Sequence, residues 1–422
     1  MDIGIILMKD DDYMKFCELS TTEFDAFVNM HPNKNFYQTS LMYNHLTNMG
    51  TEAYLVGMKN NKDEVVCASL IAAMGKSKSK KSFEALKGFL IDHSNLELLK
   101  EFTSKTKDFI KSKGGFRLFI EPYVPLIERD IDANLVEGGF DNRPLEQNII
   151  TTGFVPVDLG LVVKYTFILD INGKSSETLF NEFRPNTRNY INRTQTKYQL
   201  NVRTLTYEQL AEFKKITADT CERRDFSDKS LAYYESMYNA FGDLVKFMVV
   251  ELDCDKYIEI LKKEITEYQT KIAELSDAAS NAGKKKQMSI DIENNEKKID
   301  ETKALKEEKG NIIALSGAMF ILYGDEIIYL FSGSYKEYMK FCGQYRLQWE
   351  IIKYAADNNY KRYNFFGIQN VFDKNDPEYG VYEFKKSFNG YVEELMGSFE
   401  IGTSSYYKIY KTLRDIKNKI KR

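Results

Sequence analysis

The clearest pattern of hydrophobic and polar positions lies between Asp255 and Gly310. Apolar residues recur there at alternating spacings of three and four, with charged residues between them. That spacing keeps one apolar seam on a single helix face, which is typical of a coiled coil. The first seam consists of Ile258, Leu261, Ile265, Tyr268, Ile272 and Leu275. The second consists of Met288, Ile292, Asn295, Ile299 and Thr302.

The segment Asn281-Ala282-Gly283 separates the two seams and predicts a tight connection between two helices. Such helices fold back on each other as an antiparallel hairpin. At a rise of ~1.5 Å per residue, about 25 residues make an arm roughly 40 Å long, which must project from the globule. One interpretation is a solvated hairpin that only links two strands. The other is that the arm binds a large partner.

A basic run lies just after the predicted connection of this arm. It comprises Lys284, Lys285 and Lys286. Such a run suits the phosphates of a nucleic acid. The second seam carries Asn and Thr at core positions, which fits an isolated two-helix arm better than a permanent bundle of several helices.

The remaining pattern predicts a mixed α/β protein in which one unit occurs twice. In the first half we expect helices at 21–28 and around Leu41 and Leu46, strands at 52–59 and 64–74, a helix at 96–111 and a strand at 115–121. In the second half we expect strands at 165–169, 245–252, 312–323, 326–332, 362–366 and 391–399, and helices at 208–222, 230–241, 344–358 and 378–388. This order resembles an acyltransferase-like fold of the GNAT type. Thr21 or Thr22 is the expected N-cap of the first helix.

The repeat divides the chain into two GNAT-like domains with the arm inserted in the second. The expected boundaries are 14–153 for the first domain, 154–254 plus 311–402 for the second, 255–310 for the arm and 403–422 for a basic C-terminal helix. Two similar units that face each other leave a cleft between them, where ligands usually bind.

The C-terminal helix is strongly basic. Its cations are Lys408, Lys411, Arg414, Lys417, Lys419, Lys421 and Arg422, opposed by Asp415. It is either a solvated terminal helix or a segment attracted to an anionic membrane surface or a phosphate-bearing lipid.

Composition narrows the class of protein. A chain of 422 residues suggests two or three domains, and a net charge of −3 restricts any nucleic-acid contact to local patches. The five cysteines are scattered without metal-ligand spacing, which favours a reducing compartment and disfavours a zinc site. Without an apolar run of transmembrane length or a secretion signal, we expect a cytoplasmic protein. Residues 1–13 are either part of an alternative start or a loose tail.

Two segments carry candidate chemistry. Residues 341–346 precede a helix where coenzyme A enzymes of this fold bind pyrophosphate, but a single glycine there disfavours a coenzyme A donor. Cys342 in this segment is expected to be a small buried hydrophobe, because no histidine lies near it. The densest candidate is 379–390, where Lys385 and Lys386 emerge beside aromatic residues. A cation there can stabilise the oxyanion of acyl transfer, or the lysines are solvated charges at a helix end.

Several motifs together resemble the Fem family of peptidoglycan aminoacyltransferases (FemABX), closest to its staphylococcal FemA and FemB branch. The motifs are RYNFFGI, YGVYEFKKSFNG, LSGAMF, IIYLFSGS, QWEIIKYAADNN, NVRTLTYEQL and ERRDFSD, which surround the arm. The resemblance implies a tandem GNAT-like fold and an aminoacyl-tRNA donor. The acceptor it implies is the stem-peptide lysine, or the growing interpeptide bridge, of a lipid-linked or nucleotide-linked muropeptide. No metal, flavin or nucleotide cofactor is implied.

The resemblance also implies roles for individual residues. Lys385 would stabilise the developing charge or the tRNA terminus, and Glu121 would be a weak acid/base group. The muropeptide side would be bound by Lys229, Tyr233, Tyr329, Lys386, Arg184 and Arg188, and the tRNA by the three lysines of the arm. The segment around Arg184 and Arg188 is less basic than in close relatives, which leaves the choice between lipid-linked and nucleotide-linked substrate open.

Three readings of function remain. The first is transfer of glycine or serine to the peptidoglycan bridge. The second is a non-catalytic binding partner of bridge-building enzymes, which associates with itself or with Fem relatives through the seam of the arm. The third is a serine-inserting relative that protects the wall from a glycyl-glycine endopeptidase. In each of them the cytoplasmic face of the membrane is a candidate location.

Overall fold

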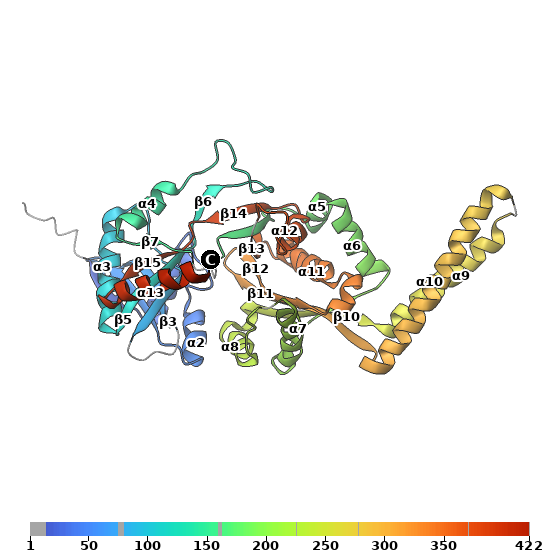
Figure 1. Cartoon of the computed structure of the whole chain (residues 1–422), viewed down its shortest axis with the longest axis horizontal. Helices are drawn as coiled ribbons and strands as arrows, with labels where there is room; N and C mark the ends of the chain where they lie inside the picture. The colour runs from blue at the N-terminus through green and yellow to red at the C-terminus, as the bar shows by residue number, and fades with distance from the viewer. Residues whose placement is uncertain are drawn as a thin grey trace, which may run out of the picture.

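The computed structural model describes residues 14–74, 80–158, 163–224, 226–276, 278–369 and 371–421, the last with side chains up to 416. The expectation for residues 1–13 lies outside this range. The described residues form a mixed α/β protein with two β-sheets side by side and a long helical arm at one end (Figure 1). The expected fold class is therefore confirmed.

The first sheet belongs mainly to the N-terminal half. Its strand order is β1 (Lys15–Glu18), β2 (Ala53–Lys59), β3 (Val65–Met74), β4 (Lys81–Lys87), β5 (Gly115–Pro122), β15 (Phe399–Gly402) and β7 (Val155–Pro156). The helices of this half are α1 (Thr21–Met30), α2 (Ser40–Asn48), α3 (Leu96–Ser112) and α4 (Arg143–Thr151). Helix α1 begins at a capping box between Ser20 and Glu23, so the expected N-cap at Thr21 or Thr22 is wrong by one or two residues.

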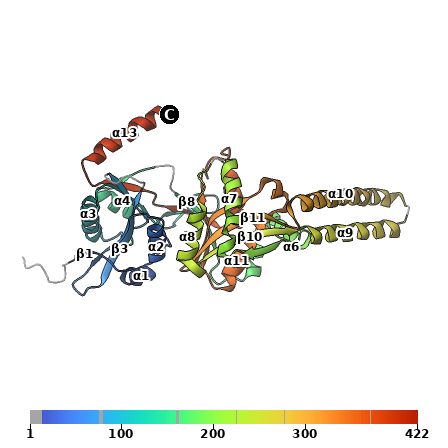
Figure 2. The same ribbon diagram turned by 90° about the horizontal axis from the view of Figure 1, so that it is seen from below.

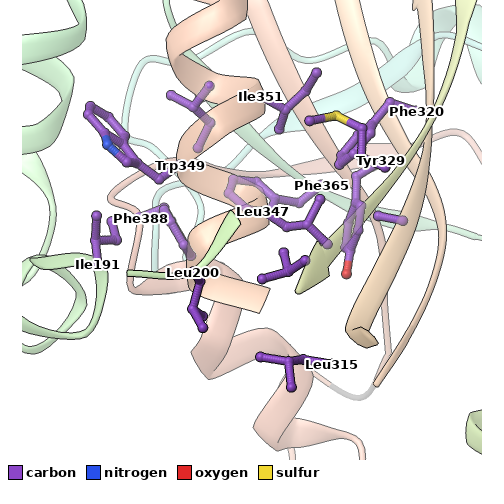
Figure 3. Packing of buried hydrophobic residues seen from close by; sticks show 14 of the residues in the cluster. Ile191, Leu200, Leu315, Phe320, Tyr329, Leu347, Trp349, Ile351, Phe365 and Phe388 are labelled. Carbon is purple, nitrogen blue, oxygen red and sulfur yellow. The ribbon is translucent and has the colours of Figure 1, made fainter. Parts of the chain in front are cut away.

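The second sheet belongs mainly to the C-terminal half. Its order is β6 (Pro125–Glu128), β14 (Tyr391–Leu395), β8 (Tyr165–Asp170), β13 (Arg362–Ile368), β12 (Glu326–Ser334), β11 (Ile312–Tyr323), β10 (Val245–Asp253) and β9 (Asn201–Thr204). Its helices are α5 (Ser176–Glu182), α6 (Pro185–Thr196), α7 (Leu210–Arg224), α8 (Leu231–Phe241), α11 (Gly343–Asp357) and α12 (Tyr379–Lys386). Figure 3 shows the core beneath α11, where Trp349, Leu347 and Phe388 pack together.

The pairing of the strands supports the predicted repeat. Strands β1 to β4 pair in antiparallel order and β4 then pairs with β5 in parallel. Strands β9 to β12 follow the same scheme, and β12 pairs with β13 in parallel. Helices α1 and α2 occupy the position in the first unit that α7 and α8 occupy in the second, and α3 corresponds to α11.

The predicted single strand at 391–399 is wrong. The chain forms β14 in the second sheet, turns at Gly397, where φ is +86°, and enters the first sheet as β15. In the opposite direction, β6 follows the first unit in sequence but pairs with β14 of the second sheet. The two sheets therefore exchange strands across the expected domain boundaries, which remain a proposal.

Side chains from both units form one shared hydrophobic core where the units meet. Leu55 and Leu70 of the first sheet belong to the same buried cluster as Met237 of α8 and Met319 and Ile328 of the second sheet. The expected cleft between the units is therefore filled by apolar side chains at this contact.

The arm consists of α9 (Cys254–Glu274) and α10 (Ala279–Lys309), which run side by side away from the second sheet (Figure 2). Leu261, Asn295 and Ile299 are buried between the helices, and Ile272 and Met288 nearer the tip are half-buried, as the two seams predict. The connection lies at 275–278, so the break expected at 281–283 is wrong. Gly283 costs only ~1 kcal/mol within a helix and does not end α10.

The base of the arm is fixed by polar contacts. The side chain of Asp253 caps α9, and the Asn311 amide donates to the Asp253 carboxylate at 3.1 Å. Lys306 of α10 pairs with Asp255 of α9 at 2.6 Å. In the part of the chain that the structure describes, no helix combines the length and apolar character needed to cross a bilayer.

Candidate active site

Lys385 lies where two neighbouring strands of the second sheet separate. The parallel pairing of β12 with β13 ends at Ile328 and Asn364, and β13 has a bulge directly after Asn364. The carbonyl oxygen of Gly367, just beyond the bulge, accepts a hydrogen bond of 2.6 Å from the Lys385 ammonium group. The side chain reaches this position because α12 packs against the core through Tyr382, so that Lys385 is only 5% exposed.

Burial changes the acidity of this lysine. It lowers the pKa of Lys385 to about 7, because desolvation disfavours the charged form, while the nearby Glu378 carboxylate acts in the opposite direction. A lysine with such a pKa changes charge near neutral pH. Groups with this behaviour are concentrated at functional sites.

Tyr329 occupies the other side of the same separation, since it directly follows Ile328 in β12. Its hydroxyl donates to the side-chain oxygen of Gln344 at 3.0 Å, near the start of α11. Burial raises the pKa of Tyr329 to about 12, and the positive charge of Arg224 opposes this rise. Arg224 also pairs with Glu378 at 3.3 Å. Glu378 is also the carboxylate that opposes the fall in the pKa of Lys385.

The other predicted cations near α12 are each held by a neighbouring group, and Lys386 is 8% exposed, so the alternative that Lys385 and Lys386 are solvated charges at a helix end is wrong. Lys386 forms an ion pair with Asp132 from the loop after β6. Arg184 pairs with Glu383 at 3.4 Å and is largely exposed, and Arg188 donates to the backbone oxygen of Asn181 at 3.4 Å. Pro185 lies in the first turn of α6, the helix that carries Arg188.

A second group of predicted residues lies between the first sheet and α8. Glu121 of β5 accepts a hydrogen bond of 2.5 Å from Lys87, and the two side chains are 7% and 4% exposed. The ammonium group of Lys229 lies 5.1 Å from the centre of the Tyr233 ring. Burial raises the pKa of Glu84 to about 7, with a further rise from Glu121 and an opposing effect of Lys229.

Two further residues belong to this second group. Burial raises the pKa of the Tyr37 hydroxyl, and Tyr233, Glu121 and Glu84 all add to the rise. Burial lowers the pKa of His45 to about 4, and the charge of Lys229 lowers it further. Glu121, Lys229 and Tyr233 therefore lie near the same buried groups, Tyr37 and Glu84.

The predicted site residues do not all lie together. Tyr329 packs into the core on the α11 face of the second sheet, whereas Tyr233 packs into the cluster on the opposite face. The three arm lysines lie in the early turns of α10, at the end of the arm that is distant from both sheets (Figure 2). A cavity of about 340 Å³ on the first unit, lined by His31, His93 and apolar neighbours, contains none of the predicted residues.

Sequence reasoning missed Arg224, Glu378, Glu84 and Lys87. Arg224 lies in the ERRDFSD motif, which was the available signal for it. Cys342, expected to be buried, is half-buried with a left-handed backbone (φ +59°) before α11. Burial raises the pKa of its thiol, which disfavours the nucleophilic thiolate.

Comparison with known proteins identifies the family. The FemAB family model matches residues 19–415. The chain is 30% identical to Aminoacyltransferase FemA of Staphylococcus epidermidis over 423 aligned positions, which cover 96% of this chain and all of the relative. The match to Aminoacyltransferase FemA of Staphylococcus aureus (strain MW2) has the same identity and coverage. The chain therefore belongs to the FemAB family, and the expected enzyme class, an aminoacyltransferase, is confirmed.

Solved structures support the same fold. A crystal structure of FemX matches 94% of this chain and 99% of its own with a TM-score of 0.70 at 24% identity. A tandem GNAT protein from the clavulanic acid biosynthesis pathway matches 93% of this chain and 99% of its own with a TM-score of 0.52 at 8% identity. The tandem GNAT-like architecture expected from the sequence is thus confirmed.

Proposed function

We propose that this enzyme transfers an amino acid from an aminoacyl-tRNA to an amine of a peptidoglycan precursor. The acceptor is the stem-peptide lysine or the end of the growing interpeptide bridge. The amine nitrogen attacks the ester carbonyl of the donor, a C–N bond forms and the C–O bond to the tRNA ribose breaks. The released ribose hydroxyl takes up a proton, and the nitrogen gives one up.

The observation that carries this proposal is the buried Lys385 at the separation of β12 and β13. An aminoacyl ester is already activated, so the protein must align the amine and stabilise the oxyanion that forms on the carbonyl. A protonated lysine in a buried site does this at a gain of roughly 10²–10³ in rate. Tyr329 and Arg224 border the same region and would orient the donor terminus.

The second group suits the acceptor. Lys229 supplies a positive charge beside Tyr233. This charge would bind the diphosphate that links the muropeptide to its lipid or nucleotide. The Glu121 carboxylate is already occupied by a buried ion pair with Lys87. Glu84, with a pKa raised to about 7, is better matched to accepting a proton at neutral pH. Arg184 and Arg188 would meet further phosphates of either substrate, and Lys386, which is buried beside Asp132, would join them only by leaving that ion pair.

The donor tRNA would lie along the arm, with Lys284, Lys285 and Lys286 near its phosphates. The seam residues of α9 and α10 pack against each other within the arm. This packing favours a rigid projecting arm over self-association through the seam. The enzyme would act in the cytoplasm, at the inner face of the membrane when its acceptor is lipid-linked. Glycine and serine are the proposed amino acids.

A transfer assay tests the proposal. The purified protein is incubated separately with labelled glycyl-, seryl- and alanyl-tRNA and with either a lipid-linked or a nucleotide-linked muropeptide. We expect labelled product with glycyl- or seryl-tRNA and one of the acceptors. If no label leaves the tRNA with either acceptor, while the protein still associates with a Fem relative in sedimentation, the non-catalytic alternative is correct and the proposal is lost.

A further inference from the structure

The last helix of the described chain, α13 (Tyr406–Lys421), presents an apolar stripe to solvent. Ile409, Leu413 and Ile416 follow spacings of four and three, which places them on one face of the helix. They are 57%, 60% and 50% exposed. Ile420 continues the same spacing in the sequence. Figure 2 shows α13 on the outside of the first unit, away from the second sheet.

A different face of α13 is fixed to the first sheet, which sets the orientation of the stripe. Arg414 donates to the two carboxylate oxygens of Glu400 at 2.6 and 2.7 Å, and the Tyr407 hydroxyl donates to the same carboxylate at 2.9 Å. Glu400 is fully buried in β15 and also binds Arg117. Because Tyr407 and Arg414 lie two turns apart on one face, this shared carboxylate holds the helix against rotation.

Cations flank the exposed stripe. By helical periodicity in the sequence, Lys408 and Lys419 fall on one side of the stripe, near Asp415, and Lys417 falls on the other; of these, the structure describes the side chains of Lys408 and Asp415. Arg414 is directed toward Glu400 and its side chain is only 16% exposed, so it contributes little to the outer surface of α13. A helix with an aliphatic face between basic edges matches the interfacial region of a bilayer that contains anionic lipids.

The observations favour a membrane over the other candidate occupants. An RNA would use the lysines but gain nothing from three exposed aliphatic side chains. A second copy of this helix, docked through the same stripe, would bring like charges together along both edges. An anionic bilayer would bury the apolar stripe and also attract the lysines.

We propose that α13 docks this enzyme on the surface of an anionic phospholipid membrane, with Ile409, Leu413 and Ile416 in the headgroup–acyl boundary. The docking would present the second unit and its site to an acceptor carried on a lipid. That consequence rests on the proposed function, whereas the membrane binding itself does not.

Vesicle flotation of the full chain tests the inference. We expect binding to phosphatidylcholine vesicles with about 30 mol% phosphatidylglycerol, weaker binding at high salt, and much weaker binding to pure phosphatidylcholine. The variant I409S/L413S/I416S should lose binding by at least ~30-fold. The variant K408Q/K417Q/K419Q, which keeps the stripe, should lose the preference for anionic vesicles.

A matched control replaces three exposed apolar residues elsewhere. The variant M30S/L135S/M339S removes side chains that are 88%, 59% and 59% exposed and should bind vesicles as the wild type does. The inference is overturned if the wild-type protein does not bind anionic vesicles, or if I409S/L413S/I416S binds them equally well. It is also overturned if this variant converts a dimer to a monomer in sedimentation, which would assign the stripe to a second copy.

The outcome separates this inference from the proposed function. If vesicle binding behaves as expected but the wild-type enzyme transfers no amino acid to any acceptor, membrane docking by α13 is supported and the proposed function is wrong. If the stripe variant keeps full transfer to a nucleotide-linked acceptor and loses transfer to a lipid-linked acceptor in vesicles, both stand.

Discussion

The ammonium group of Lys385 and the carbonyl oxygen of Gly367 are 2.6 Å apart at the point where β13 leaves its parallel partner. A backbone carbonyl is a neutral acceptor, so this contact positions the lysine without neutralising its charge. The ammonium group is therefore held in a buried place and remains able to interact with a negative charge that develops on a substrate.

The stability of the protein should depend on pH through Lys385. Its pKa is about 7 in the folded protein and has an ordinary value of 10.5, so the unfolded chain binds more protons between these limits. The contribution of Lys385 to the free energy of unfolding must therefore rise with pH across this window. In urea unfolding, K385M should have a larger free energy of unfolding than the wild type at pH 7. This difference should be smaller by about 2 kcal/mol at pH 9, because the wild type becomes more stable over this range. A gap that is independent of pH would contradict the buried environment of Lys385.

Loss of the Glu121 carboxylate should be costly. In E121Q, Lys87 is left buried without a counter-charge, and we expect the free energy of unfolding to fall by about 3 kcal/mol. The control E52Q breaks the ion pair of Glu52 with Lys81, which is 33% and 20% exposed, and should cost less than ~1 kcal/mol. Equal losses in the two variants would show that the Lys87–Glu121 pair is not desolvated.

The lysines near the tip of the arm should contribute to tRNA affinity. The variant K284Q/K285Q/K286Q should bind tRNA roughly tenfold more weakly and show a smaller salt dependence, because fewer counterions are released. The control K262Q/K263Q/K297Q removes the same charge from exposed positions elsewhere on the arm. If both variants bind tRNA equally well in filter binding, the tip has no special role.

We expect Asn295 to weaken the arm, because it places a polar side chain in the apolar seam. It is 4% exposed within the seam and donates to Glu264 at 2.9 Å. In N295L an apolar side chain continues the seam between Ile292 and Ile299, and we expect about 1 kcal/mol of added protection in amide hydrogen exchange of α9 and α10. The neighbouring N294L, at an exposed position, should leave exchange unchanged. Lower protection in N295L would mean that the polar contact stabilises the arm.

The sequence pattern predicted elements well where periodicity alone determines them. The heptad seams, the repeated unit and the helix that carries Lys385 follow from spacing, and the structure contains each of them. The connection of the arm was misplaced because Asn281 and Gly283 resemble a turn, although a long paired helix tolerates both. The strand at 391–399 was predicted as one because apolar residues continue through Gly397, and only tertiary pairing separates β14 from β15.

The candidate site could be predicted only in part. Lys385 was found from its motif, but its contact with Gly367 depends on a bulge in β13 that leaves no mark in the sequence. Tyr329 and Tyr233 were expected to line one cleft. However, alternate side chains of β12 face opposite sides of the sheet, and Tyr329 faces the core under α11, whereas Tyr233 of α8 packs into the core on the other side. The position of Glu84 beside Glu121 and Lys229 depends on the packing of α8 against the first unit, which no local pattern encodes.

Single-turnover transfer by K385M tests the central claim most directly. With enzyme in excess over charged tRNA and with saturating muropeptide, the account predicts that the wild type and the surface control K361Q form product at similar rates. K385M should be slower by roughly 10²–10³, with its fold retained by circular dichroism. We expect the wild-type rate to decline above pH 7, where Lys385 loses its proton, and K385R, which stays charged, should lose this decline. Transfer by K385M at the wild-type rate would contradict the claim that the buried lysine stabilises the transition state.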